Sequence, residues 1–309
     1  MRGLFILLGS ISFCVFAGDF VVLDMKDYYN ESSRVLFVKD LSRGFHEIGA
    51  VVVVNTGINN ELVTRAFRAA EQFFSLSEKV KKKYDGAQIS YQRGYLPLRA
   101  EKAMHSAEGD YKEVYHFGRD NNQYPKEIDI QDAIAPYFRE LEHYMTLFQE
   151  AIAMAMGMPK GFFLPITTEG ESILRAIHYP PHLGTWAEEH IDIDLFSIFP
   201  KATLGGLEIK DREEKWVKVE VPEGGVIVTA GYFLENLSNG YFPAGKQRVV
   251  SYEKRLDRYA LGFFAHPKDH ILLGPLSKMI EKTGGVKRYA DLNRKELLIE
   301  RLAHPGKKF

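Results

Sequence analysis

The sequence predicts an α+β protein that is mainly β, with helices in its N-terminal half and a sandwich or barrel of short strands in its C-terminal half. Before about residue 160, apolar residues recur at spacings of three and four residues, the period of an amphipathic helix. From Ile173 onward, short apolar runs alternate with Gly, Pro and Asn, which is typical of many short antiparallel strands.

Length and charge limit the possibilities further. The 309 residues, 45% of them hydrophobic, suffice for one large core. We expect one structural domain, residues 19–309, with an N-terminal helical and lid part over 19–160 and a strand-rich core over 161–309. The chain has 40 basic and 41 acidic residues, so no net electrostatic field favours binding to nucleic acid.

The first 18 residues differ from the rest. Arg2, an apolar run from Leu4 to Phe16 and a small-residue end fit a secretory signal peptide, and the run is too short to span a membrane. The only cysteine, Cys14, lies inside this segment. We expect a secreted or periplasmic protein with no integral membrane segment after leader removal. The alternatives are an apolar N-terminal element packed on the domain and a cytoplasmic location.

The N-terminal elements follow in order. A strand is expected at Phe20 to Asp24, an amphipathic helix over Ser33 to Gly49, and a buried strand over Val51 to Val54. Asn59 or Asn60 is expected to cap a second helix that runs to about Phe74.

Residues 86–123 lack sustained periodicity, so they are interpreted as a long loop or lid. A third long helix is expected over Ala135 to Met156, with Pro136 in its first turn.

Seven strands and a last helix are expected after that. The strands are Ile173 to Tyr179, Ile193 to Phe199, Leu207 to Lys210, Trp216 to Val221, Val226 to Thr229, Arg248 to Glu253 and Tyr259 to Phe264, and the helix runs from Ala290 to Ala303.

His190 and Asp192 are the most informative pair of residues. On a strand, residues i and i+2 point to the same side. One imidazole nitrogen and one carboxylate oxygen would therefore converge as two of the three facial ligands of a non-haem Fe(II) oxygenase. Asp194 lies on the same face again, and we interpret it as an ordinary carboxylate rather than a ligand.

Several other segments, in the same order, resemble the isopenicillin N synthase-like family of Fe(II)/2-oxoglutarate-dependent oxygenases. The resemblance covers nearly the whole chain and implies a double-stranded β-helix, or jelly roll, flanked by N-terminal helices. It rests on Phe20–Asp24, Gly49–Gly57, Phe73–Lys81, Arg93–Tyr95, Leu174–Pro181, Gly206–Ile209, Leu237–Gly240, Gln247–Val249 and Arg258–Ala260.

The resemblance implies that the third iron ligand stands directly before Arg248. A histidine is expected there, but the chain has Gln247. A neutral amide oxygen is a poorer donor than imidazole for a divalent first-row metal. Three interpretations stay open: Gln247 ligates weakly, water fills the third place, or the site has lost iron. Neither His178 nor His266 is expected to replace the missing ligand.

The resemblance also implies the co-substrate site. Arg258 and Ala260 occupy the positions of an R-x-S motif that holds the distal carboxylate of 2-oxoglutarate, with alanine in place of serine. Tyr179 is expected to donate its hydroxyl to the same carboxylate.

Four residues of the expected lid are candidate substrate contacts, with solvated loop residues as the alternative interpretation. They are Arg93, Tyr95, Lys112 and Glu113.

The expected function is that of a non-haem Fe(II) oxidoreductase. It would use 2-oxoglutarate and O2 to hydroxylate, desaturate or cyclise a small organic substrate. The expected cofactor is Fe(II), and the expected oligomeric state is a monomer. The alternative is an impaired relative that binds a small molecule or a partner without catalysis.

Overall fold

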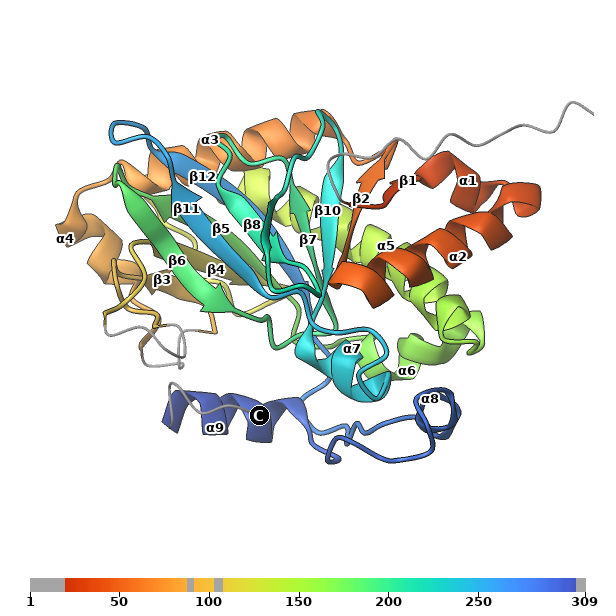
Figure 1. The fold of residues 1–309 in the computed structure, drawn as a ribbon. Coiled ribbons are helices and arrows are strands. Elements are labelled where there is room, and N and C mark those ends of the chain that lie inside the picture. The colour runs from red at the N-terminus through yellow and green to blue at the C-terminus, as the bar shows by residue number, and fades with distance from the viewer. Residues whose placement is uncertain (1–19, 88–91, 103–107, 304–309) are drawn as a thin grey trace, which may run out of the picture.

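Two β-sheets face each other, and helices cover the outer side of the larger sheet (Figure 1). The computed structural model describes residues 20–87, 92–102 and 108–303. The larger sheet has the order β1-β2-β10-β7-β12-β5-β4-β3, and the smaller sheet has the order β6-β11-β8-β9. The strands are β1 (Val22–Asp24), β2 (Ala50–Val54), β3 (Gly94–Leu96), β4 (Glu113–Gly118), β5 (Ile173–Tyr179), β6 (Gly184–His190), β7 (Phe196–Pro200), β8 (Leu207–Lys210), β9 (Trp216–Lys218), β10 (Val226–Ala230), β11 (Gln247–Ser251) and β12 (Arg258–Ala265).

Strand alternation divides the core into two layers. On β2, Val51 and Val53 pack against the helices, whereas Ala50 and Val52 face the smaller sheet, where they meet Ile209 of β8. The expected α+β class with a two-sheet jelly-roll core is confirmed. The helices are α1 (Met25–Tyr29), α2 (Glu31–Ile48), α3 (Asn60–Phe74), α4 (Glu78–Lys81), α5 (Gln131–Ala155), α6 (Leu164–Thr167), α7 (Tyr232–Leu237), α8 (Ser277–Lys282) and α9 (Arg294–Ala303).

Helix ends follow the local sequence closely. Gly49 ends α2 in the left-handed conformation at φ 71°, which glycine adopts without steric cost. The Asn59 side chain caps α3 by accepting a bond from the Glu61 amide (2.9 Å). These two helix predictions are confirmed.

Helix α5 begins earlier than predicted. It starts at Gln131, so Pro136 lies inside the helix and not in its first turn. A proline has no amide to donate to the carbonyl four residues back. That carbonyl, of Asp132, instead accepts a bond from Arg65 Nη2 (2.9 Å). A tertiary contact from α3 therefore compensates for the proline.

The predicted loop over residues 86–123 is partly wrong. It contains β3 and β4, which extend the larger sheet beyond β5. All six residues of β4 are buried, so this strand shows no alternation of apolar and polar residues. Strand β6, which ends at His190, was also not predicted.

Residues 1–18, the predicted leader, lie outside the described residues, so leader and compartment stay predictions. Within the described part of the chain, no helix has the length and apolar character needed to cross a membrane.

Candidate functional site

The strands of the smaller sheet bring His190 and Gln247 together. His190 is the last residue of β6, and it is paired directly with Gln247, the first residue of β11. Asp192 lies beyond the strand, in the turn that leads to β7. Its carbonyl accepts a bond from the Tyr232 amide at the start of α7 (2.8 Å). The turn and α7, and not strand alternation, therefore place Asp192.

The Asp192 carboxylate accepts two hydrogen bonds on one oxygen. Gln247 Nε2 donates to Oδ2 (2.7 Å), and the Ser197 hydroxyl lies 2.8 Å from the same atom. Asp192 is 8% exposed and Gln247 is 3% exposed, so both bonds are shielded from water. Oδ1 is left as the oxygen that a metal would take.

Asp194 completes this cluster, and its surroundings favour the protonated form of its carboxyl. Ser197 Oγ also lies 2.7 Å from Asp194 Oδ2, yet a hydroxyl has one proton to donate. Burial and the neighbouring charge of Asp192 raise the pKa of Asp194 well above its ordinary value. The Asp194 carboxyl can therefore donate to Ser197 while Ser197 donates to Asp192. With Asp194 protonated, the cluster carries one negative charge.

His190 has one ring nitrogen committed to the backbone. Nδ1 lies 2.7 Å from Glu188 O, and a carbonyl can only accept, so Nδ1 carries the proton. In a neutral ring, Nε2 then keeps its lone pair for a metal, the usual arrangement of a ligating histidine.

This donor set fits Fe(II) in two places and departs from the usual set in the third. His190 and Asp192 are ligands of the expected type. Among the described residues, no three His, Cys, Asp or Glu side chains are grouped so as to hold a metal ion. A neutral amide, that of Gln247, is therefore the donor available beside them.

Arg258 and Tyr179 face the same cavity from the larger sheet. They are paired across β12 and β5, and the Arg258 guanidinium carbon lies 4.8 Å from the centre of the Tyr179 ring. Arg258 Nε donates to the carbonyls of Leu204 (3.0 Å) and Gly205 (3.1 Å). Nη1 is buried and has no partner within the described structure. A buried guanidinium with a free N–H fits the carboxylate of an anionic co-substrate.

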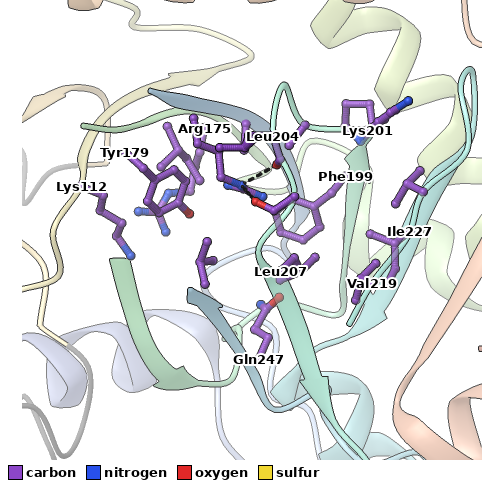
Figure 2. A pocket seen from close by; sticks show the side chains of 18 of the residues that line it. Lys112, Arg175, Tyr179, Phe199, Lys201, Leu204, Leu207, Val219, Ile227 and Gln247 are labelled. Atoms are coloured by element: carbon purple, nitrogen blue, oxygen red, sulfur yellow. Dashed lines mark hydrogen bonds between the residues drawn. The ribbon is translucent and has the colours of Figure 1, made fainter. Parts of the chain in front are cut away.

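A single cavity of about 360 Å³ joins the two groups (Figure 2). His190, Asp192 and Gln247 line it together with Arg258 and Ala260. Figure 2 shows Gln247 and Tyr179 on its polar side, with Phe199, Val219 and Ile227 on the apolar side. Its volume lies in the range of small-molecule sites.

Comparison with known proteins agrees with this geometry. A model of the non-haem dioxygenase N-terminal region matches residues 21–134, and a model of the 2OG-Fe(II) oxygenase superfamily matches residues 170–267. The chain belongs to the 2OG-Fe(II) oxygenase superfamily. Members of this superfamily use Fe(II), 2-oxoglutarate and O2.

Similar proteins span most of the chain. A 2-oxoglutarate-Fe(II) type oxidoreductase of Aspergillus fumigatus is 27% identical, with 79% of this chain and 80% of the relative covered. Leucoanthocyanidin dioxygenase of Malus domestica is also 27% identical, over 84% of this chain and 77% of the relative. The structure of a 2OG-Fe(II) oxygenase family protein from Caulobacter crescentus superimposes with a TM-score of 0.83 at 28% identity, covering 93% and 99% of the two chains. These matches favour an oxygenase over the non-catalytic alternative.

Within this oxygenase, the four predicted lid residues have different positions. Lys112 lines the cavity. Arg93 is buried outside the residues that line it, and donates to the carbonyls of Gln92 and Asp120.

Tyr95 and Glu113 are corrections, because they lie on β3 and β4 and not in a lid. Their side chains meet on the helix-covered face, where Tyr95 donates to Glu113 (2.5 Å). Glu113 also contacts Lys81 Nζ and His178 Nδ1, both at 2.7 Å. This buried network holds α4 to the sheet and does not line the cavity.

Sequence reasoning gave no role to Arg175, which lines the cavity from β5. Its Nη2 pairs with Glu101 (2.5 Å), a residue that was also missed. A usable signal existed, because Arg175, Ile177 and Tyr179 share one strand face by alternation. A cation on that otherwise apolar face indicates a cavity.

Proposed function

We propose that this protein oxidises a small organic substrate with Fe(II), 2-oxoglutarate and O2, through a site in which His190 and Asp192 hold the iron and Gln247 stands at the third ligand position. The observation that carries the proposal is the buried Arg258 guanidinium with an unpartnered Nη1, in the same cavity as His190 and Asp192. Fe(II) supplies the activation of O2 when it is bound.

The chain's own residues would then bind and orient. Glu188 O fixes the protonated nitrogen of His190, and the bonds from Gln247 and Ser197 hold the Asp192 carboxylate in one orientation. Arg258 and Tyr179 would receive the distal carboxylate of 2-oxoglutarate. Ala260 adds no hydroxyl there, so Arg258 and Tyr179 carry this contact alone.

We also propose that the protein acts as a monomer on small molecules, without nucleic acid, and that residues 1–18 direct it to the secretory pathway. The balanced charge and the apolar leader segment support these proposals.

Anaerobic Fe(II) titration of the full chain, with and without 2-oxoglutarate, tests the proposed site. We expect a visible absorption band that appears only when both are present, as a metal-chelated 2-oxo acid gives. An Arg258→Met variant should need much more 2-oxoglutarate to reach the same band. Arg248→Met is the matched control, because Arg248 pairs with Glu208 (2.7 Å) and does not line the cavity. Absence of the band in the natural protein at millimolar 2-oxoglutarate would refute the proposal.

A further inference from the structure

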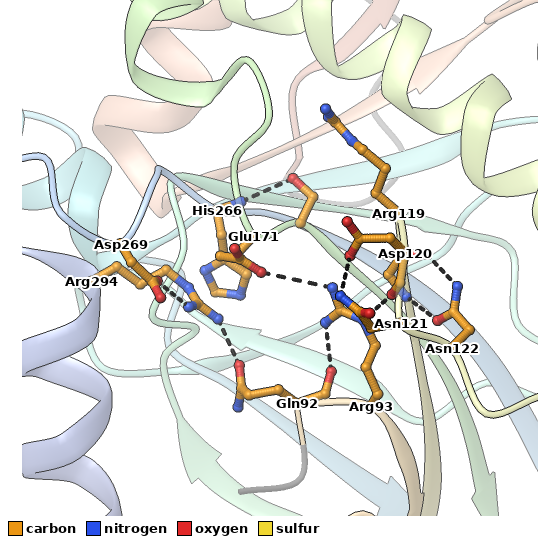
Figure 3. Close-up of polar contacts among 12 residues, drawn as sticks. Gln92, Arg93, Arg119, Asp120, Asn121, Asn122, Glu171, His266, Asp269 and Arg294 are labelled. Carbon is orange, nitrogen blue, oxygen red and sulfur yellow. Dashed lines mark hydrogen bonds and ion pairs between the residues drawn. The ribbon is translucent and has the colours of Figure 1, made fainter. Parts of the chain in front are cut away.

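Basic side chains from distant parts of the chain gather around His266, and one of them, Arg175, also lines the cavity. Lys112 and Arg175 line the cavity itself. Arg93 and Arg294 lie further out, where Figure 3 shows them close to His266. Arg294 belongs to α9, which lies below the two sheets in Figure 1. The C-terminal helix thus contributes a cation to the cluster that includes Arg175, a residue that lines the cavity.

Arg175 connects this cluster to the iron-binding end of the cavity. It shares the cavity lining with His190 and Asp192, and the charge of Asp192 is among the causes that act on its pKa, after burial and Glu101. Its Nη2 is paired with Glu101, but its Nε is buried and has no partner within the described structure. One N–H of this guanidinium is therefore available to an acceptor.

The Arg294 guanidinium is held by two partners, but one of its N–H groups has no hydrogen-bond acceptor within the described residues. It is 3% exposed, with Nη1 2.5 Å from Asp269 Oδ1 and Nη2 2.7 Å from Gln92 Oε1. Its Nε is buried without a partner in the described part of the chain, and so is Nδ1 of His266. Buried polar atoms are normally hydrogen-bonded. Three such atoms belong to this basic cluster, and Arg175, which carries one of them, lines the cavity, so a polar ligand in the cavity could satisfy at least that atom.

His266 is buried next to several of these basic side chains. Burial lowers its pKa well below the ordinary value, and the charges of Arg294, His116, Arg175 and Arg93 lower it further. Every charged neighbour among these causes is basic.

The carboxylates near these cations are arranged unevenly. Glu101 lies between Arg175 Nη2 (2.5 Å) and Lys112 Nζ (3.1 Å), and Lys112 also pairs with the buried Asp110 (2.8 Å), so a carboxylate fits beside each of these cations. By contrast, Asp269 and Glu171, the partners of Arg294 and Arg93, are 39% and 45% exposed. Water screens these outer carboxylates, so they offset the inward-facing charge only in part.

We propose that the part of the cavity lined by Arg175 is an anion subsite and that the substrate is a small organic acid, whose carboxylate is received by Arg175 and, from the α9 side, by Arg294. The inference rests on the proposed function, because it assigns the substrate class of that same site. A carboxylate offers about four lone-pair positions and matches the planar fork of arginine. It would satisfy N–H groups that the protein leaves unpaired.

Binding of a matched acid and amide tests this proposal. Cyclohexanecarboxylate and cyclohexanecarboxamide have similar shapes and differ in charge. Each is titrated by calorimetry into the full-length protein saturated with 2-oxoglutarate, so that Arg258 is already occupied. We expect the acid to bind at least about tenfold more tightly than the amide, as charge-assisted hydrogen bonds predict.

Three variants locate the effect. Arg294→Gln and the double variant Arg175→Met with Glu101→Gln should each remove most of the preference for the acid. The double change removes both members of an ion pair, so no buried charge is left alone. Arg119→Gln is the matched control, since Arg119 pairs with Glu142 (2.6 Å) and does not line the cavity. An unchanged affinity for 2-oxoglutarate in each variant would demonstrate an intact fold.

Equal binding of acid and amide, no acid binding at millimolar concentration, or a preference that survives both variants would overturn the inference. The measurement needs neither iron nor turnover. A protein that prefers the acid but fails to bind iron would contradict the proposed function alone. An active oxygenase without the preference would contradict the anion subsite alone.

Discussion

Replacing Gln247 with histidine should strengthen Fe(II) binding. In the natural protein Gln247 Nε2 donates to Asp192 Oδ2 at 2.7 Å in a buried place. If the amide turns to bring its oxygen to a metal, this bond is lost. A hydrogen bond to a charged group contributes roughly 1.5 to 3 kcal/mol, which corresponds to roughly 10- to 150-fold in affinity. Gln247→His avoids the loss of this hydrogen bond on metal binding and supplies a better donor. We therefore expect the Fe(II) affinity to increase at least about tenfold.

The assay is anaerobic Fe(II) titration of the natural protein, Gln247→His and Gln247→Leu. The leucine variant removes the hydrogen bond without supplying a ligand, so the difference between the two variants isolates the contribution of the imidazole. The imidazole must be neutral to bind, so the gain should fade as the pH drops below about 6.5. If Gln247→His binds Fe(II) no more tightly than the natural protein, residue 247 does not face the metal, and the reasoning fails.

Three further predictions concern single side chains. Ala260→Ser should restore a hydroxyl beside Arg258 and tighten 2-oxoglutarate binding by roughly tenfold in equilibrium titration. Arg258→Met should weaken the same binding by roughly a hundredfold while leaving Fe(II) affinity unchanged, because it removes a charge-assisted contact. His266 is buried with a lowered pKa, so below about pH 6.5 the unfolded state binds more protons than the folded state. The free energy of unfolding should therefore decrease as the pH is lowered, by up to about 1.4 kcal/mol per pH unit. Urea unfolding at pH 5 and pH 7 should show a smaller loss for His266→Gln.

Each of these predictions has a contradicting result. An unchanged affinity in Ala260→Ser would place residue 260 away from the co-substrate. Loss of iron binding in Arg258→Met would mean that the variant disturbs the whole site. Equal pH dependence of the natural protein and His266→Gln would mean that other groups govern acid stability.

Elements whose signal is local were predictable from the sequence. The apolar period of α2 and the glycine at its end are both readable within the segment, so Gly49 was identified as the stop. Strand β4 was missed because both of its faces are buried, and no alternation marks it. Its Glu113 looks like a loop residue until Lys81 and His178 are brought to it from 32 and 65 residues away.

In the candidate site, too, residues with a local sequence signal were predictable, whereas those placed by long-range contacts were not. The motif around His190 indicated the metal-binding end, but the turn that positions Asp192 depends on α7, which the sequence analysis did not find. The pairing of His190 with Gln247 is a long-range register that no local pattern contains. Arg294 lies still further away along the chain, and its position depends on how α9 folds back toward β3.

The neighbourhood of Gln247 bears on what the substitution means. A buried carboxylate without a metal would be costly unless other groups satisfied it. Here Gln247 and Ser197 both donate to Asp192, so two hydrogen bonds stabilise its charge. In a metal-free state of this oxygenase, the Asp192 charge is therefore still stabilised by hydrogen bonds. Gln247 thus stabilises the Asp192 carboxylate in the absence of a metal, while Asp192 Oδ1 stays available to iron.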